Sequence, residues 1–274
     1  MQIEFVTPNT ALSPRSAVAA LVFEGGTLGS AAQQLDGATS GAIGRAIAAS
    51  RFTGAKGQTL DLIAPSGTEA ARVILVGAGP AASFTAKIAE SVAASAYQAV
   101  KLSGVETLTL LLADQTDAIA AQAAFGVRLA AYRFDRYRTT EKADKKPSVT
   151  KVQVVVANPD QTTDAFDPLS TLAEAVYFSR DLISEPANIL YPEEFARRVK
   201  RLEALGLEVE ILGEKEMTAL GMGSLLGVGQ GSRRESQMAV IQWKGAPESK
   251  DKPLAFVGKG VCFDTGGISI KPAD

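Results

Sequence analysis

The sequence contains no histidine and only one cysteine, Cys262. Without histidine, the chain cannot form a Ser-His-Asp triad or a Cys-His pair, and zinc sites built from histidine and cysteine are excluded as well. A single cysteine cannot form an intrachain disulfide, which fits a reducing compartment. Any chemistry must therefore use carboxylates, lysine, arginine, hydroxyl groups, backbone groups or a metal ion held by oxygen and amine ligands.

Long apolar runs and a strong net charge are also missing. No apolar run approaches the ~20 residues that span a bilayer, and the first eight residues lack the basic start and apolar stretch of a signal peptide. The 28 basic and 30 acidic residues give a formal net charge of −2, which argues against a dedicated nucleic-acid or membrane-surface binder. We expect a cytoplasmic protein with no membrane partner.

A length of 274 residues with 46% hydrophobic residues is enough for one or two buried cores. Apolar or β-branched runs of strand length occur at 60–64, 72–76, 107–112 and 151–157, and Ala-rich helical stretches at 81–102 and 118–132 lie between them. Strands that are almost continuously apolar and alternate with helices indicate a mostly parallel sheet that is covered on both faces. We predict an α/β protein whose residues 1–162 form a three-layer, macro-domain-like sandwich.

The segment from Asp160 to Pro168 has the composition of a loop, and we place a domain boundary between residues 162 and 163. After it we predict a helix near 169–184 and a second helix from Tyr191 to a C-cap at Gly206. Strands should follow at 207–212, 238–243 and 253–259. Residues 163–274 would then be a linker helix and the first part of a second α/β domain, which is incomplete.

Two glycine-rich turns partly match phosphate-binding loops. Gly77-Ala-Gly79-Pro-Ala-Ala82 follows a strand and fits the loose dinucleotide pattern G-x-G-x-x-G/A, but the acidic residue expected ~20 residues later is missing. A tight strand-to-helix turn without a ligand is the better interpretation. Gly227-Val-Gly229-Gln-Gly231 lacks the Gly-Lys-Ser/Thr of a P-loop, which leaves a structural glycine loop or a wall of a substrate pocket.

The segment 132–151 is locally basic, with seven cationic side chains against three acids. It is either a basic recognition patch or a solvated loop with a charged helix end, and we favour the solvated loop. Cys262 is best interpreted as a small buried apolar residue, because no histidine is present to activate it as a nucleophile.

Three side chains near the end of the sequence could bind a metal ion or take part in catalysis: Lys259, Asp264 and Lys271. The first two follow the apolar run 253–258, and catalytic groups of open α/β sheets gather just past the carboxyl ends of strands. Glycines flank Lys259, and a Gly-Gly pair after Asp264 lets the backbone approach a ligand closely. This pattern favours a site over the alternative of three ordinary surface residues.

The three side chains lie in a longer motif, Val257-Gly-Lys-Gly-Val-Cys-Phe-Asp-Thr-Gly-Gly-Ile-Ser-Ile-Lys-Pro-Ala273. Three further stretches precede it: Tyr132-Arg-Phe-Asp-Arg-Tyr137, Arg180-Asp-Leu-Ile-Ser-Glu-Pro-Ala-Asn-Ile-Leu-Tyr-Pro-Glu-Glu-Phe195 and Leu220-Gly-Met-Gly-Ser-Leu-Leu-Gly-Val-Gly-Gln-Gly-Ser232. In this order along the chain, the four stretches resemble the leucine aminopeptidase (cytosol aminopeptidase) family of dinuclear metallopeptidases, and the motif at 257–273 is the most specific of them. The resemblance is strong from residue 132 onward and diffuse before it.

The resemblance implies a cytosolic, metal-dependent leucyl aminopeptidase that releases N-terminal amino acids, Leu preferred, from peptides by two-metal-activated water attack. It implies that Lys259 and Asp264 are ligands of two divalent metal ions, Mn²⁺ or Zn²⁺, and that Lys271 is the catalytic lysine. A paired-metal site of this kind needs no histidine. The resemblance also implies peptide substrates with a free N-terminus, and a homo-hexamer for the full-length parent.

The family's remaining metal ligands and its catalytic arginine belong to Asn-Thr-Asp-Ala-Glu-Gly-Arg and to an aspartate before it, and neither segment occurs in these 274 residues. We therefore expect the chain to correspond to an N-terminal portion of such an enzyme and to be inactive alone. Two alternatives remain. One is a non-enzymatic DNA-binding or regulatory role, with local support from the basic segment 132–151. The other is nucleotide or ADP-ribose binding by the N-terminal domain at the Gly77 turn.

Overall fold

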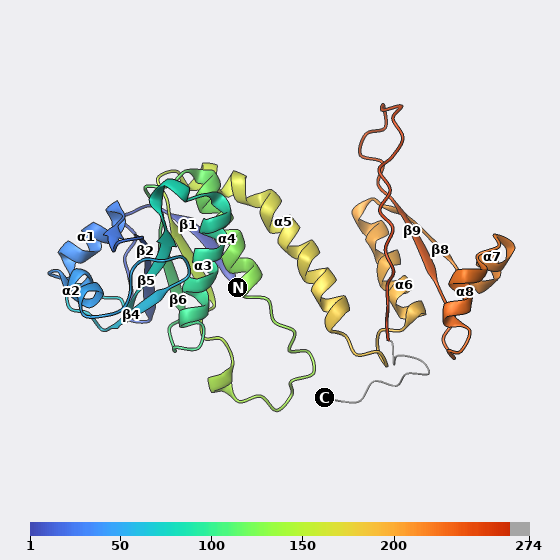
Figure 1. The fold of residues 1–274 in the computed structure, drawn as a ribbon, viewed down its shortest axis with the longest axis horizontal. Coiled ribbons are helices and arrows are strands. Elements are labelled where there is room, and N and C mark those ends of the chain that lie inside the picture. The colour runs from blue at the N-terminus through green and yellow to red at the C-terminus, as the bar shows by residue number, and fades with distance from the viewer. Residues whose placement is uncertain (264–274) are drawn as a thin grey trace. The chain divides into compact units, whose positions relative to one another are not determined.

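The computed structural model describes residues 1–263. The chain divides into two compact units, Met1–Ser179 and Arg180–Asp274, which are described separately below (Figure 1). In the described part of the chain, none of the helices combines the length and the apolarity that a membrane crossing requires.

The first unit is built on a seven-stranded sheet with the strand order β1-β7-β6-β2-β5-β4, and the short β3 pairs with β2. Every pair from β1 to β5 in that order is parallel, whereas β4 and β3 pair antiparallel with their neighbours. The strands are β1 (Gln2–Val6), β2 (Ser16–Phe23), β3 (Thr27–Leu28), β4 (Thr59–Ile63), β5 (Arg72–Gly79), β6 (Thr107–Leu111) and β7 (Lys151–Val155). The predicted α/β class with a mostly parallel sheet is confirmed.

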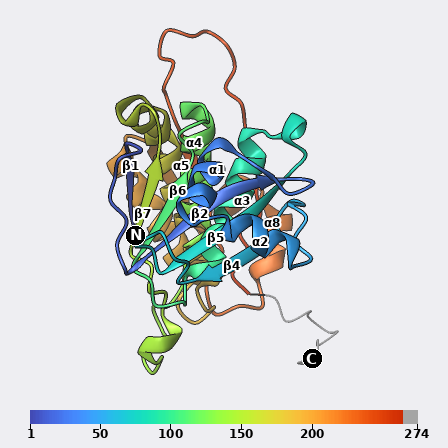
Figure 2. The ribbon, with the colours of Figure 1, turned by 90° about the vertical axis from the view of Figure 1, so that its left-hand side faces the viewer.

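Helices cover both faces of this sheet (Figures 1 and 2). On one face, α1 (Ser30–Ala38) and α2 (Ala42–Ala48) share a core with Val18 and Ala20 of β2. On the other face, α3 (Ala86–Val100), α4 (Asp117–Ala130) and the first part of α5 (Pro159–Ser184) share a core with Ala17 and Ala19. Because successive strand residues point to opposite faces, a strand covered on both sides must be apolar throughout, which explains the continuous run in β2.

Small residues let α3 and α4 approach each other closely. Ala89, Ala93, Ala120 and other alanines of the two helices are buried in the shared core. The tightest contact is at Gly126, where an added Cβ would lie 2.1 Å from the carbonyl oxygen of Glu90. The separation of these two helices therefore depends on a glycine at this position.

The long helix α5 begins at Pro159, so the loop predicted over 160–168 is wrong. Proline is well tolerated in the first helical turn. The Thr162 hydroxyl donates to the Asp117 carboxylate at 2.7 Å, and Phe166 is buried in the core. These tertiary contacts outweigh a second proline inside the helix. The proposed domain boundary between residues 162 and 163 lies within α5 and stays a prediction.

The second unit packs α6 (Pro192–Lys200) against an antiparallel pair, β8 (Glu208–Leu212) and β9 (Met238–Gln242). After α6, the 3-10 helix η3 (Arg201–Leu205) ends at Gly206, whose φ of +85° is the left-handed C-cap that the sequence predicts. Two short helices, α7 (Glu214–Ala219) and α8 (Gly223–Gly229), lie between the strands in sequence. The glycine loop predicted over 227–231 is thus helical in its first half.

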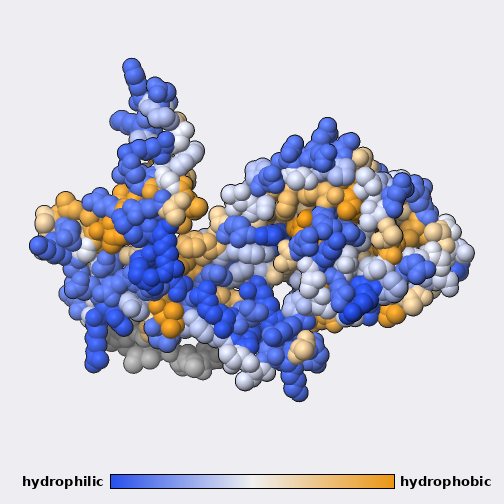
Figure 3. All heavy atoms as spheres, turned by 180° about the vertical axis from the view of Figure 1, so that it is seen from behind, coloured by the Kyte–Doolittle hydropathy of each residue, from blue (hydrophilic) through white to orange (hydrophobic). Residues whose placement is uncertain are grey.

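The strand predicted over 253–259 is not formed in the described part of the chain. Leu254, Phe256 and Val257 are 88%, 93% and 98% exposed. Strands are stabilised by hydrogen bonds and side-chain pairs with a neighbouring strand, and among residues 1–263 this segment pairs with none of the strands. The residues between β9 and this segment form a projection that is largely hydrophilic (Figures 1 and 3).

Candidate functional site

Lys259 is the one predicted site residue within the described part of the chain. It is exposed and lies on the unpaired apolar segment that follows β9. The next residue, Gly260, passes close to α6, because an added Cβ there would lie 2.6 Å from Cε1 of Phe195. On the other side of the lysine, a Cβ at Gly258 would meet nothing within 4 Å. One of the two glycines therefore makes room for a phenylalanine ring, and the other leaves the lysine accessible.

The other two predicted site residues, Asp264 and Lys271, lie outside the described residues. Within 1–263, no cluster of three or more His, Cys, Asp or Glu side chains could hold a metal ion. An amine and a carboxylate are suitable donors for Mn²⁺ or Zn²⁺. The predicted pair Lys259 and Asp264 therefore fits such an ion chemically, but two ligands are fewer than one zinc site requires.

Cys262 is half-buried and lies two residues before Asp264. Burial raises the pKa of its thiol, and the carbonyl oxygen of Gly260 lies 3.9 Å from Sγ. A nucleophilic cysteine needs a neighbour that stabilises the thiolate, and these surroundings do the opposite. The structure therefore gives no support to a catalytic thiol.

An ion-pair network that the sequence did not reveal organises the start of the second unit. Arg198 donates from Nε to Glu194 at 2.8 Å and from Nη1 to Glu185 at 3.1 Å. The hydrogen bond from Arg198 lowers the pKa of the Glu194 carboxyl, and Arg197 adds to the effect. The spacing between residues 194 and 198 on one helix could have been found from the sequence. The contact with Glu185, thirteen residues away, could not.

The segment 54–58 packs against the glycine turn at the end of β5 and occupies its N–H groups. The N–H of Gly77 donates to the carbonyl oxygen of Gln58 at 2.8 Å, and the N–H of Gly79 donates to that of Gly54 at 2.9 Å. A Cβ at Gly77 would lie 2.0 Å from the carbonyl oxygen of Ala55. Dinucleotide sites use such free N–H groups and close approach to hold a pyrophosphate. Here the segment 54–58 takes that place, which supports the interpretation as a structural turn.

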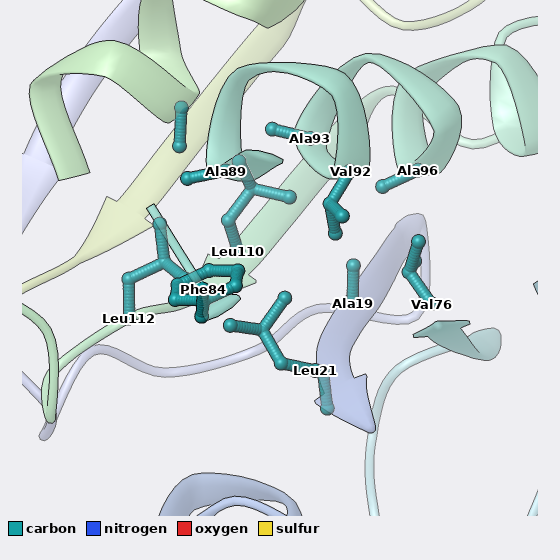
Figure 4. A pocket seen from close by; sticks show the side chains of 12 residues that line it. Ala19, Leu21, Val76, Phe84, Ala89, Val92, Ala93, Ala96, Leu110 and Leu112 are labelled. Atoms are coloured by element: carbon teal, nitrogen blue, oxygen red, sulfur yellow. The ribbon is translucent and has the colours of Figure 1, made fainter. Parts of the chain in front are cut away.

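A cavity of about 10 Å³ lies beside this turn, between the sheet and α3 (Figure 4). All of its lining side chains are apolar, among them Leu21, Phe84, Val92 and Leu110. A space of this size holds one water at most, and a water would find no polar partner there. The cavity is therefore a packing defect of the core rather than a ligand site.

Family models match both parts of the chain. Residues 19–141 match the N-terminal domain of the cytosol aminopeptidase family, and residues 177–274 match its catalytic domain. The chain belongs to the cytosol aminopeptidase family. The catalytic-domain match begins close to the start of the second structural unit at Arg180, and it includes Lys259, Asp264 and Lys271.

Curated relatives of the chain carry the name probable cytosol aminopeptidase. The relative from Caulobacter vibrioides is 61% identical over 274 residues, which is all of this chain and 55% of the relative. The relative from Sinorhizobium fredii is 46% identical over 240 residues, which is 85% of this chain and 48% of the relative. The chain thus spans about half the length of the curated relatives that it matches.

Solved structures of related fold include a mutant of tomato leucine aminopeptidase. That structure has a TM-score of 0.75 and 21% sequence identity, and the match covers 88% of this chain and 50% of that one. At this identity the likeness concerns the fold alone. The bottromycin maturation enzyme BotP in complex with Mn has a TM-score of 0.61 and 27% identity, with 84% of this chain and 45% of that chain covered.

Proposed function

We propose that the protein to which these residues belong is a metal-dependent leucyl aminopeptidase of the cytoplasm, which releases N-terminal amino acids, Leu preferred, from peptides. The observation that carries this proposal is the match of residues 177–274 to the catalytic domain of the cytosol aminopeptidase family. That range contains all three predicted site residues, and the relatives from Caulobacter vibrioides and Sinorhizobium fredii bear the corresponding name.

In this proposal Lys259 and Asp264 bind divalent metal ions, and Lys271 stabilises negative charge on the substrate. Lysine binds a metal only as its free amine, and the exposed position of Lys259 leaves that amine accessible. Two bound divalent ions would polarise the peptide carbonyl and activate a water molecule. Lys271 would donate to the carbonyl oxygen as negative charge develops there, which is the kind of interaction that accelerates the chemical step.

The metal, the substrate and the assembly follow as further parts of the proposal. Mn²⁺ is the first ion to test, because BotP was solved in complex with Mn, and Zn²⁺ is the second. The substrates are peptides with a free N-terminus. A homo-hexamer of the full-length protein rests on the family resemblance, and sedimentation equilibrium of that protein would measure it directly.

A polypeptide limited to these 274 residues should not hydrolyse leucine p-nitroanilide above background with Mn²⁺ or Zn²⁺. The reason is that Lys259 and Asp264 are its only predicted ligands, and two donors cannot fix two ions in a catalytic geometry. If this polypeptide hydrolysed leucine p-nitroanilide and a chelator abolished that activity, the assignment of the ligands would be contradicted.

Substitution of Lys259 and of Lys271 in the full-length protein should affect different properties, metal content in the first case and kcat in the second. Lys259→Ala should lower the metal content, and added metal should restore part of the rate. Lys271→Ala should leave the metal content near that of the wild type while kcat falls ~10²–10³-fold, as is typical when one donor to a developing charge is removed. Metal analysis beside steady-state kinetics decides the matter, and the reverse pattern would mean that the roles are exchanged.

A further inference from the structure

A second cavity, of about 280 Å³, lies in the first unit and is separate from the predicted metal site. The C-terminal ends of α3 and α4 and the loop 132–147 enclose it. All of its lining residues belong to the first unit. Its volume is close to the lower end of small-molecule sites, which begin at about 300 Å³, so it has room for one ring and one charged group.

Positive charge dominates the lining of this cavity. Four cationic side chains line it, Lys101, Arg133, Arg138 and Lys145, against the single carboxylate of Glu141, so that the net charge of the lining is +3. The carboxylate is already engaged, because it pairs with Arg133 and lies 3.6 Å from Arg138. The hydrogen bond from Arg133 holds the pKa of this carboxyl below its usual range, so Glu141 stays ionised and contributes a single negative charge.

Several donors of the cavity remain available. Within residues 1–263, the ammonium groups of Lys101 and Lys145 form no ion pair with a carboxylate. The Nε of Arg133 is already paired with a carboxylate oxygen of Asp135, 3.2 Å away. The two lysines are therefore the cations that an anion in the cavity would meet without displacing a carboxylate.

Helix ends account for only part of this charge. A helix C-terminus carries roughly −0.5 of an elementary charge, and cations near it are favourable. The ends of α3 and α4 together therefore offset about −1, whereas the lining carries +3. The carboxylate of Asp135, 3.2 Å from the Nε of Arg133, offsets one further charge, so a net charge of about +1 remains on the lining in the described part of the first unit.

The walls of the cavity are aromatic and apolar. Tyr97, Tyr132 and Phe134 are among its lining residues, together with Leu102 and alanines of α4. Tyr97 is 2% exposed, and burial raises the pKa of its hydroxyl, which stays a neutral group. Tyr132 packs on Tyr177, and Phe134 packs on Tyr137, so these walls are held in place by their own neighbours. A bare inorganic ion would use the cations alone, whereas a ring attached to the anionic group would also contact the aromatic and apolar lining.

We propose that this cavity binds a small organic anion, in which an aromatic or apolar group carries a phosphate or a carboxylate. The proposal is independent of the aminopeptidase activity, because no residue of the predicted metal site takes part. Phosphate and carboxylate share the chemistry that the cations recognise, and the experiment separates them. A cavity of this size does not admit a nucleic-acid duplex.

The test is calorimetric titration of the 274-residue chain with phenyl phosphate, benzoate and inorganic phosphate. Phenyl phosphate or benzoate should bind with one-to-one stoichiometry and more tightly than inorganic phosphate. Lys101→Met and Lys145→Met should each weaken that binding at least tenfold, with an unchanged circular dichroism spectrum. The matched control is Lys87→Met, because Lys87 lies fourteen residues before Lys101 along α3, about 21 Å at 1.5 Å per residue, and pairs with Glu90.

Three outcomes would overturn the proposal. The first is the absence of binding by the wild-type chain at millimolar ligand. The second is binding that Lys101→Met and Lys145→Met leave unchanged, which would place the ligand elsewhere. The third is salt-dependent binding of duplex DNA that both variants lose, without any binding of phenyl phosphate or benzoate. That result would make the basic loop a nucleic-acid surface instead.

Discussion

The Glu185 carboxylate and the Arg198 guanidinium form an ion pair at 3.1 Å, and the side chain of Glu185 has no exposed surface. The pair joins the turn after α5 to the last turn of α6 across thirteen residues. A buried charge that loses its partner is far more costly than a surface pair that is broken. The integrity of the second unit therefore depends on Arg198 more than on any of its exposed ion pairs.

Arg198→Met should destabilise the second unit by about 3–5 kcal/mol, because it leaves the Glu185 carboxylate buried without this partner. Arg197→Met is the matched control. Arg197 also donates to Glu194, at 2.7 Å, but its side chain is 60% exposed, and it should cost less than about 1 kcal/mol. Native-state hydrogen exchange of the α6 amides measures both. Equal losses in the two variants would refute the special role of the buried pair.

The second unit should lose stability in acid through Glu194. The hydrogen bond from Arg198 lowers the pKa of this carboxyl below the unfolded value of 4.5. A lowered folded-state pKa gives stabilisation that is fully present above the unfolded pKa and is lost as the pH falls through the folded one. Glu194→Gln should therefore be less stable than the wild type at neutral pH, and the difference should shrink below pH 4.5.

Thermal unfolding of both proteins across this pH range measures the effect. Glu193→Gln serves as the control, because the side chain of Glu193 is 48% exposed and its contact with Arg234 is 3.8 Å long. A difference between wild type and Glu194→Gln that stays constant down to strong acid would show that the carboxylate is not the source of the stabilisation.

Gly126→Ala should destabilise the first unit by about 1–3 kcal/mol. The new methyl group would lie 2.1 Å from the carbonyl oxygen of Glu90, so α3 and α4 must move apart. Gly37→Ala in α1 is the control, because no atom lies within 4 Å of its added Cβ; it should be neutral or stabilising by roughly 0.5–1 kcal/mol. Urea unfolding decides, and two variants with the same stability would argue against close packing at residue 126.

Polypeptides 1–165 and 1–179 should both fold, but the shorter one should be less stable. It lacks Phe166 and Ala173, which are buried, and Glu174 and Tyr177, which contact Arg128. We expect a loss of about 2 kcal/mol, which lowers the Tm by about 4–8 °C in a unit of this size. Equal melting temperatures would show that the second half of α5 adds nothing to the first unit and would favour a boundary near residue 162.

Calorimetric titration with ADP-ribose should give no binding to the first unit at the Gly77 turn. The N–H groups of Gly77 and Gly79 already donate to carbonyl oxygens of the segment 54–58, and a pyrophosphate would have to displace that segment. A measurable heat that Gly77→Ala abolishes would contradict this interpretation of the turn. A heat that this variant leaves intact would point to a different binding site.

Local patterns predicted the strands β4, β5, β6 and β7 and the helices α3 and α4 of the first unit, but β1, β2, β3, α1 and α2 were not predicted. The apolar runs of β5, β6 and β7 and the helical stretches of α3 and α4 were predicted within a few residues, because a buried parallel strand and an Ala-rich helix each carry their own signature. The start of α5 was missed because its stability comes from Thr162 and Phe166 meeting distant residues. The strand at 253–259 was wrongly predicted because strand formation depends on a neighbour that composition does not reveal.

The candidate site shows the same division between local and distant information. Lys259, Asp264 and Lys271 were found because they belong to one short motif that resembles a family signature. The ion pair between Glu185 and Arg198 was missed, because nothing in the intervening sequence marks the two residues as partners. The closing of the Gly77 turn by the segment 54–58 was missed for the same reason, since its hydrogen bonds join separate parts of the chain.

Gly54 of the segment 54–58 and Gly77 of β5 lie close together, so the costs of changing them should be non-additive. A Cβ at Gly54 would lie 2.1 Å from the carbonyl oxygen of Phe23, and one at Gly77 would lie 2.0 Å from that of Ala55. Both clashes involve the same segment, so whichever substitution comes first displaces it and relieves the second. The double substitution should therefore cost less than the two single ones together, as neighbouring sites with a shared backbone shift do. An ancestral chain that had lost one glycine could lose the other at little further cost, whereas regaining the turn would require both.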